Sequence, residues 1–486
     1  MTWFVWSLPT LALAAAVLSA RVSVQTSAAI ALAVAIAVSA WSAVTPFGIP
    51  QLLLAVGRGA WIGATIAPYI LGGLVFWQVA GREADGAPEA PDDARPKGLA
   101  ARRHLFFACF LVGPFAESAT GFGVGMVGTV LMLRGMGFAP RHLMVFALLS
   151  QTMIPWGAMA SGMLLAAAYV GITPGELGVH VALPVAVLMA VWLALFWRTA
   201  RAAGIEGSPR EQAGEAAWVL CGVALTAAST AVIGPEVALL SAYGPLIVLR
   251  FVLDRRPTTA RFRSAARQAL PYVVVVGGIA LARLVTPIRQ ALAGAWQLEP
   301  FDDLPAFAPL VHAGIWFAAG AVATAAARGG IARLGAESAA AWKSGRQAVL
   351  TLFLFAMMAE VLAAAGISRA MASGLFAAMG TGAIVVTPVL SGFLGILTNS
   401  GNAPNSLFMP SLVALATTAK LSVPAVAAIQ HTAGMALTLF SPVRMTITAS
   451  LCGGAGEEGG VYRYLLPYAG AAFVVVIAGA WLATAL

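Results

Sequence analysis

The chain is built from long apolar runs separated by short polar segments. A helix needs ~20 residues to cross the ~30 Å hydrocarbon core of a bilayer, and runs of about that length recur from end to end. They predict membrane spans at 2–20, 22–44, 51–79, 142–168, 177–197, 214–233, 235–250, 268–286, 305–327, 345–366, 372–390, 423–450 and 464–486. We therefore expect an all-α polytopic integral membrane protein with about 12–14 membrane segments.

Two further apolar segments, 104–133 and 391–418, are interrupted by glycine, proline and hydroxyl residues. The arms on either side of each interruption are shorter than a full span. Irregular backbone at membrane depth is tolerated only where protein buries it or where it lines a watery cavity. Paired interruptions in the two halves of a chain are typical of transporters with inverted repeats and a site near the bilayer midplane. We expect each segment to be a broken or re-entrant helical hairpin that contributes to such a site.

The distribution of charge supports a membrane location and predicts an orientation. The chain is 60% hydrophobic and only 10% charged, whereas about a quarter of the residues in soluble domains are charged. The most basic loop, 250–267, is assigned to the cytoplasm because loops rich in Lys and Arg stay inside. It is expected to link an N-terminal repeat, 1–249, to a C-terminal repeat, 268–486. Counting the membrane crossings on either side, with the loop 81–103 also assigned to the cytoplasm, places both ends of segment 104–133 in the cytoplasm. The side of the membrane from which the second hairpin enters stays open.

The net charge of +9 resides in short basic loops without interleaved aromatic residues. This pattern favours contact with anionic lipid of the inner leaflet and argues against a nucleic-acid surface. We expect a multi-pass protein of the bacterial inner (plasma) membrane.

Glu117 is the strongest candidate for chemistry, because it is the carboxylate inside the first interrupted segment. An ionised carboxylate at membrane depth is costly unless it is paired, so it tends to be protonated or partnered. This favours a proton carrier. The alternative is that Glu117 only accepts hydrogen bonds from backbone amides freed at the hairpin tip. Its neighbours at the predicted site are Ser118, Thr120, Gly121 and Gly123.

The second interruption carries neutral polar residues only. Such groups, with exposed amides at helix N-termini, can hold a carboxylate through hydrogen bonds and the helix dipole. The alternative is a simple polar turn at the membrane surface, which leaves the apolar arms unexplained. The predicted substrate-binding residues here are Thr398, Asn399, Ser400, Asn402, Asn405 and Ser406.

The predicted span 423–450 contains His431, the break Ser441-Pro442 and Arg444. Arginine binds carboxylates through two parallel hydrogen bonds, so Arg444 is a candidate substrate anchor or partner of Glu117; the alternative is an arginine that reaches an interface. His431 is a candidate for the proton pathway, against an ordinary role in helix packing. A similar polar break after the first hairpin adds Gln151 and Thr152 to the predicted site.

No cofactor or metal site is expected from the five histidines and the isolated Cys109, Cys221 and Cys452. These residues lack metal-ligand spacing and supply no clustered nucleophile, which argues against an integral-membrane enzyme. A channel is also disfavoured, because no ring of like charges or repeated filter occurs.

The two interruptions resemble signatures of the L-lactate permease family, proton symporters for lactate and glycolate within a wider ion-transporter superfamily. Residues 115–123 (FAESATGFG) resemble its FLEGAAGFG stretch, and residues 398–408 (TNSGNAPNSLF) resemble its TGSDTSSNALF stretch. The Ser441-Pro442 step and residues 456–459 resemble a third block. This distant resemblance implies inverted repeats in which a region carrying both hairpin tips moves against a scaffold. Glu117 is shared, whereas Gly401 and Thr438 stand where the family has aspartate and lysine; Arg444, absent from the family pattern, is a candidate replacement for that lysine.

These features together predict a secondary active symporter that imports a small organic anion, such as the monocarboxylates lactate or glycolate, with a proton. An anion that enters alone is opposed by ~2.3 kcal/mol per charge per 100 mV of inside-negative potential, whereas an anion with a proton is not. Sodium coupling remains an alternative, because neutral hydroxyl and carbonyl groups also coordinate sodium. The sequence leaves open a homo-oligomer.

Overall fold

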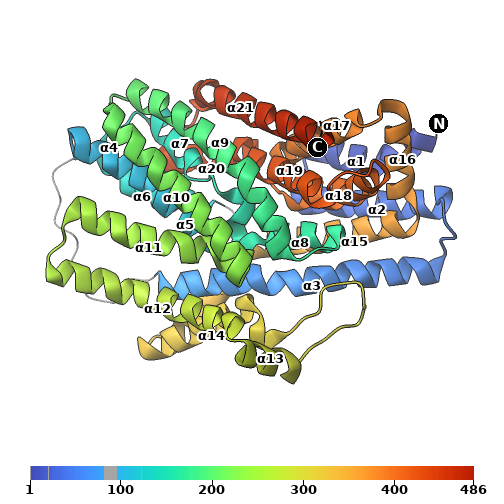
Figure 1. The fold of residues 1–486 in the computed structure, drawn as a ribbon, viewed down its shortest axis with the longest axis horizontal. Helices are drawn as coiled ribbons and strands as arrows, with labels where there is room; N and C mark the ends of the chain where they lie inside the picture. The colour runs from blue at the N-terminus through green and yellow to red at the C-terminus, as the bar shows by residue number, and fades with distance from the viewer. Residues whose placement is uncertain (1, 20, 82–95, 122, 486) are drawn as a thin grey trace.

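The computed structural model of the protein describes residues 2–19, 21–81, 96–121 and 123–485, and in these residues it is all-helical apart from one isolated β-bridge (Figure 1). In the described part of the chain, ten helices are long and apolar enough to cross a membrane. The count is eleven if one helix pair, bent by 55°, forms a single span. The protein is therefore a multi-pass membrane protein. Residues 82–95 of the loop 81–103, used above for orientation, lie outside the described residues.

Four of the continuous helices begin at a hydroxyl residue. The side chains of Ser23, Thr173, Ser208 and Thr258 each accept a hydrogen bond from the first turn of their helix, which satisfies an otherwise free amide. The continuous helices are α1 (Thr2–Leu18), α2 (Val24–Ser42), α3 (Ile49–Ala80), α9 (Pro174–Ala202), α10 (Pro209–Ile233), α11 (Pro235–Arg255), α12 (Thr259–Leu284), α13 (Thr286–Ala295), α14 (Ala313–Ala327), α15 (Leu334–Ala364), α16 (Ile367–Met379) and α21 (Glu458–Ala485).

The first interrupted segment is a helical hairpin. Its first arm joins α4 (Gly98–Phe107), a π-helical turn and α5 (Gly113–Thr120), and its second arm is α6 (Val124–Leu133). The ring Nε2 of His104 lies 2.9 Å from the carbonyl oxygen of Met132, so the two ends lie together, as expected. The expected shortness of the first arm was wrong: it extends back to Gly98 because the basic sequence 98–103 also forms helix.

The second hairpin consists of α17 (Gly382–Thr398) and α18 (Asn402–Thr418), and it begins before the predicted position 391. The predicted span 372–390 was wrong, because its residues belong to the end of α16 and the start of α17. Between these helices Gly380 has a φ of 56° and ends α16. Such a positive φ is easy for glycine, and the prediction overlooked the break that Gly380-Thr381-Gly382 makes in the apolar pattern.

Each hairpin is followed by a broken helix and then by a long helix. The first broken helix is α7 (Pro140–Leu149) with α8 (Gly157–Val170), followed by α9; the second is α19 (Val423–Ala436) with α20 (Pro442–Cys452), followed by α21. The start of α8 lies against the first hairpin tip, and Gly162, further along, accepts a hydrogen bond from Asn405 of the second hairpin. In Figure 1 the first hairpin lies toward the end of the molecule that carries α4, and the second lies toward the end that carries α16.

Close helix contacts surround α3, which packs against α14 and α15. A Cβ atom on Gly72 would lie 2.0 Å from the carbonyl oxygen of Gly314, and one on Gly59 would lie 2.4 Å from the Cα of Met357. Small residues of this kind let membrane helices pack backbone to backbone. In the same bundle Arg58 Nε donates to Glu360 Oε2 at 2.8 Å. Arg58 also hydrogen-bonds Asp303 in the loop before α14, which holds the pKa of that carboxyl below its usual range.

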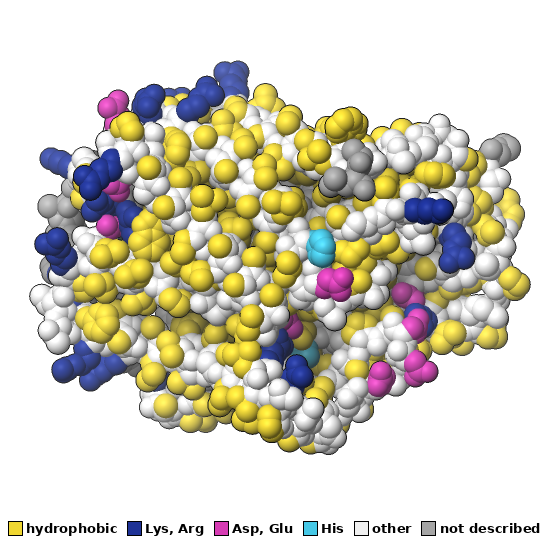
Figure 2. Space-filling view, viewed as in Figure 1, with side chains coloured by type: hydrophobic (Ala, Val, Ile, Leu, Met, Phe, Trp, Pro, Cys, Tyr) yellow, Lys and Arg dark blue, Asp and Glu magenta, His cyan; other side chains and the backbone are white. Residues whose placement is uncertain are grey.

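Lys and Arg side chains gather at one end of the molecule, around the ends of α9 and α11 and the starts of α4 and α12 (Figure 2). Arg103 pairs there with Glu211 and Asp254, which joins α4, α10 and α11. The expected linker 250–267 lies at this end and is mostly helical, with only a short turn between α11 and α12. The face shown in Figure 2 is largely hydrophobic between the two ends, as a lipid-facing surface requires.

Candidate functional site

The side chain of Arg444 joins the two hairpin tips and the first helix break. Its position follows from the second break, where Ser441 caps the start of α20 and leaves Arg444 in the first turn. Arg444 Nη1 donates to Gln151 Oε1 at 2.7 Å and lies 3.4 Å from Glu117 Oε1. Arg444 Nε donates to Asn399 Oδ1 at 3.0 Å. Four segments far apart in the sequence therefore converge on one guanidinium.

Glu117 is buried at the first hairpin tip and has two kinds of partner. It pairs with Arg444, and its Oε2 also accepts a hydrogen bond from the backbone amide of Gly123 at 3.1 Å. Gly121 and Gly123 have φ values of 64° and 88°, so the tip uses the backbone freedom of glycine. A Cβ atom on Gly121 would lie 2.6 Å from the Cβ of Ala158, which leaves no room for a side chain there.

The second hairpin tip is neutral and tightly hydrogen-bonded. Asn399 has a φ of 52°, a left-handed conformation that asparagine tolerates better than most residues. Thr398 Oγ1 donates to the carbonyl oxygen of Ser400 at 3.1 Å, and Ser400 Oγ accepts from the amide of Asn402 at 3.3 Å. These bonds hold the Asn399 carboxamide against Arg444. The tip is buried polar structure and not a surface turn.

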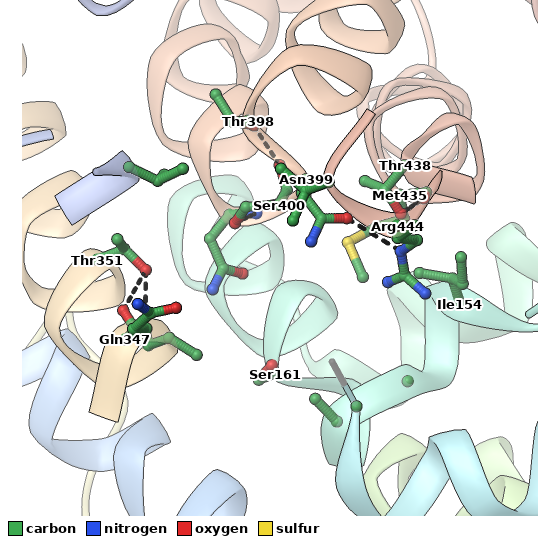
Figure 3. A pocket seen from close by; sticks show the side chains of 18 of the residues that line it. Ile154, Ser161, Gln347, Thr351, Thr398, Asn399, Ser400, Met435, Thr438 and Arg444 are labelled. Carbon is green, nitrogen blue, oxygen red and sulfur yellow. Dashed lines mark hydrogen bonds between the residues drawn. The ribbon is translucent and has the colours of Figure 1, made fainter. Parts of the chain in front are cut away.

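A cavity of about 270 Å³ lies beside these groups. Seven of the residues expected at the site line it: Glu117, Gly121, Thr398, Asn399, Ser400, Asn402 and Arg444. Glu117 and Arg444 are the two charged residues among those that line it in the described part of the chain. Figure 3 shows Arg444 and Asn399 on one side and Gln347 and Thr351 of α15 on the other.

The other residues expected at the site do not line the cavity. Gln151 and Gly123 lie directly behind it, as hydrogen-bond partners of Arg444 and Glu117. The hydroxyls of Ser118 and Thr120 donate to backbone carbonyls of their own helix, and Ser441 acts as a helix cap. Thr152 and Ser406 are buried outside the cavity.

His431 and Asn405 form a separate buried pair. Asn405 Nδ2 lies 3.0 Å from His431 Nδ1 and 3.0 Å from the carbonyl oxygen of Gly162. His431 Nε2 lies 3.4 Å from the carbonyl oxygen of Pro155. The pattern fits a neutral ring that donates at Nε2 and accepts at Nδ1. No hydrogen bond between described residues joins His431 to Glu117 or Arg444.

Several lining residues were missed by the sequence analysis, notably Ser161, Gln347 and Thr351. Gln347 and Thr351 stand one turn apart on α15 and so share a face, but nothing local shows that this face meets a hairpin almost fifty residues away. Ser161 follows three residues, Ala158 to Ala160, with left-handed φ values between 50° and 55°. That irregular turn directs the start of α8 toward the cavity, and no glycine in it signals the conformation.

Neither protein-family models nor curated proteins yield a match to this chain. The site is therefore interpreted from its own geometry. One detail bears on the expected resemblance to lactate permeases. Thr438, at the position of that family's lysine, lines the same cavity as Arg444. Among the described residues, no group of three or more His, Cys, Asp and Glu side chains could hold a metal ion.

Proposed function

We propose that the protein is a secondary active transporter that carries a small monocarboxylate, together with a proton, across the bacterial inner membrane. The observation that carries this proposal is the contact of Arg444 with Glu117 in a cavity whose other described lining residues are uncharged. An arginine can anchor a carboxylate, and a carboxylate can carry a proton. In this protein Arg444 and Glu117 line the same cavity.

The shared arginine couples the two ligands by charge balance. In the empty site the charges of Arg444 and Glu117 cancel. A substrate carboxylate that joins them adds an uncompensated negative charge to a largely dehydrated site, which is costly. Protonation of Glu117 removes its charge and frees Arg444 for the substrate. The anion and the proton therefore bind together, and neither is favoured alone.

Neutral acceptors keep Arg444 in place during this exchange. Gln151 and Asn399 hold its Nη1 and Nε whether or not Glu117 is protonated. Among the described residues no hydrogen bond occupies Nη2, which leaves this donor for a substrate oxygen. The complex of one anion and one proton is electroneutral, so an inside-negative potential does not oppose import.

The arrangement of the helices supports a transporter with two inverted repeats. The order hairpin, broken helix and long helix occurs twice, and the hairpins lie toward opposite ends of the molecule. The resemblance of residues 115–123 and 398–408 to lactate permease signatures supports the same reading and makes lactate and glycolate the first substrates to test. The basic end would then face the cytoplasm and the anionic lipid of the inner leaflet.

Sodium is a second candidate for the coupling ion, because some buried oxygens lack a partner. Thr152 Oγ1, Asn405 Oδ1 and Gln430 Oε1 are buried without a hydrogen bond in the described part of the chain. Neutral oxygens of this kind coordinate sodium in other transporters.

The test is uptake of labelled lactate, glycolate and related acids by purified protein in liposomes, with a pH gradient and a sodium gradient imposed separately. We expect accumulation with the pH gradient alone and none in liposomes that contain Arg444→Gln. Accumulation with the sodium gradient alone would transfer coupling to the buried oxygens. Absence of organic-anion uptake under both gradients would refute the proposal.

The orientation can be tested by labelling single cysteines placed at the exposed Leu99 and Ala139, on either side of the first hairpin. A cysteine at the nearby position of Arg102 would not be accessible to the reagent, because that residue is fully buried. In a background without Cys109, Cys221 and Cys452, both positions should react with membrane-impermeant reagents from the cytoplasmic face only. Labelling from opposite faces is incompatible with a re-entrant hairpin.

A further inference from the structure

The cavity wall opposite Arg444 carries neutral hydrogen-bonding side chains beside apolar residues such as Ala348 (Figure 3). Thr351 Oγ1 donates to backbone carbonyls of its own helix at 2.8 and 3.0 Å, which leaves its lone pairs free to accept. Gln347 is exposed and presents both a donor and an acceptor. Ser161 is only 4% exposed, and its hydroxyl has no hydrogen bond within the described residues, although it lines the cavity. This wall can both donate and accept several hydrogen bonds.

The charge of the cavity limits what can occupy that wall. Arg444 is the only cation among its described lining residues, and it lies on the other side. The second carboxylate of a dicarboxylate would meet Ser161, Gln347 and Thr351, which offer it hydrogen bonds but no counter-charge. An apolar tail would leave the buried Ser161 hydroxyl without a hydrogen-bond partner, which disfavours such a ligand. Hydroxyl groups on the ligand are uncharged and can hydrogen-bond with this wall, so they avoid both problems.

The size of the cavity points in the same direction. A volume of about 270 Å³ corresponds to roughly nine water molecules at ~30 Å³ each. A three-carbon acid bound at Arg444 would leave much of this space, and the opposite wall, to water.

We propose that the preferred substrates are polyhydroxylated monocarboxylates longer than lactate, such as aldonic acids, with the carboxylate at Arg444 and the distal hydroxyls at Ser161, Gln347 and Thr351. This inference rests on the proposed function for the carboxylate end only. It adds a second subsite, which selects the far end of the molecule by hydrogen bonds.

The test uses ligand-induced thermal stabilisation of the purified full-length protein, which reports binding whether or not transport occurs. The probes are gluconate, lactate, hexanoate and succinate. Gluconate should bind at least tenfold more tightly than lactate, and hexanoate and succinate more weakly than gluconate. A gluconate affinity equal to or below that of lactate would overturn the inference.

Two variants then locate the subsite. Ser161→Ala and Thr351→Val should each weaken gluconate binding about three- to tenfold and change lactate binding less than about twofold, because one neutral hydrogen bond is lost at the far end. Thr417→Val is the matched control, since the Thr417 hydroxyl makes the same type of intrahelical bond on α18 but is exposed outside the cavity. Equal losses for gluconate and lactate would contradict a distal subsite.

The outcomes separate this inference from the proposed function. Uptake of lactate with no preference for gluconate would overturn the distal subsite and leave proton-coupled transport intact. Tight gluconate binding without uptake of any acid would refute transport and support the subsite.

Discussion

Two buried arginine–glutamate pairs in this protein have the same chemical groups but different hydrogen-bond partners and surroundings. Arg102 and Glu215 form two hydrogen bonds of 2.7 Å, and their side chains are 1% and 0% exposed. Trp197 Nε1 donates to the same carboxylate at 2.7 Å, and the Arg102 guanidinium lies 5.2 Å from the centre of the Phe196 ring. In contrast, Arg444 and Glu117 make one contact of 3.4 Å beside a cavity.

The comparison shows how a structural pair differs from an exchangeable one. Every strong donor and acceptor around Arg102 and Glu215 is engaged with protein, so no ligand can replace either partner. Around Arg444, the shortest bonds go to the neutral side chains of Gln151 and Asn399, and the contact with the carboxylate is the longest. Burial of opposite charges is common to both pairs. Two features distinguish the pair in which a substrate carboxylate can replace the glutamate: access to a cavity, and neutral acceptors that also bind the arginine.

The largest effect is expected from breaking the structural pair. Arg102→Gln leaves Glu215 buried without its counter-charge and should lower the free energy of unfolding by about 3–5 kcal/mol. The measurement is the apparent Tm of the detergent-solubilised protein, followed by tryptophan fluorescence. Arg103→Gln, at a neighbouring pair that is more exposed, is the control and should cost at most about 1 kcal/mol. Similar Tm values for Arg102→Gln and Arg103→Gln would contradict a special structural role of the Arg102–Glu215 pair.

Arg444→Gln should lower the Tm less than Arg102→Gln does, because Glu117 keeps its hydrogen bond from the Gly123 amide and lies beside the cavity; its main effect should be weaker anion binding. Loss of a charged hydrogen bond in a buried site corresponds to about 1.5–3 kcal/mol, or roughly 10- to 150-fold in affinity. Arg444→Lys should recover part of this loss, because it keeps the charge without the planar fork. Titration of purified protein with lactate or gluconate gives the affinities. Unchanged affinity in a well-folded Arg444→Gln protein would rule out the anchor.

Glu117→Gln should remove the pH dependence of binding. The wild-type complex holds one more proton than the empty site once Glu117 is ionised there, so affinity should fall as pH rises, by up to about tenfold per pH unit. Glu117→Gln imitates the protonated state, so its affinity should not change with pH over the same range. In liposomes it should still exchange substrate but lose accumulation driven by a pH gradient. Full proton-driven accumulation by this variant would direct attention to His431 or to sodium.

The smallest effect is expected from Gln151→Leu, which removes a neutral acceptor from Arg444. Affinity should fall about two- to tenfold, as for loss of one hydrogen bond. The slope of affinity against pH should stay that of the wild type, because the Gln151 bond is present before and after proton binding. Gln290→Leu, on the exposed helix α13, is the control. A flattened pH slope in Gln151→Leu would mean that Gln151 takes part in proton exchange.

Local physical chemistry explains which expectations the structure confirmed. Hydropathy alone predicted the helical membrane protein, since apolar runs of sufficient length have few other stable states. The interruptions near Glu117 and Asn399 were visible because Gly, Pro and hydroxyl residues break an apolar pattern. The boundary between α16 and α17 was missed, although Gly380-Thr381-Gly382 interrupts the apolar run there, because the apolar stretches on either side were read as one span.

The sequence by itself determined the membrane class, the two hairpins, and Glu117 and Arg444 as charges that need partners in an apolar setting. Tertiary structure alone decided the partners. Glu117 pairs with Arg444, 327 positions away, and Arg58 pairs with Glu360, 302 positions away. It also decided that Gln347 and Thr351 of α15 face the site. The physical reason is that desolvation forces a buried charge to find a partner, whereas the partner's identity depends on which helices pack together, and hydrophobic pattern along one helix does not encode its neighbours.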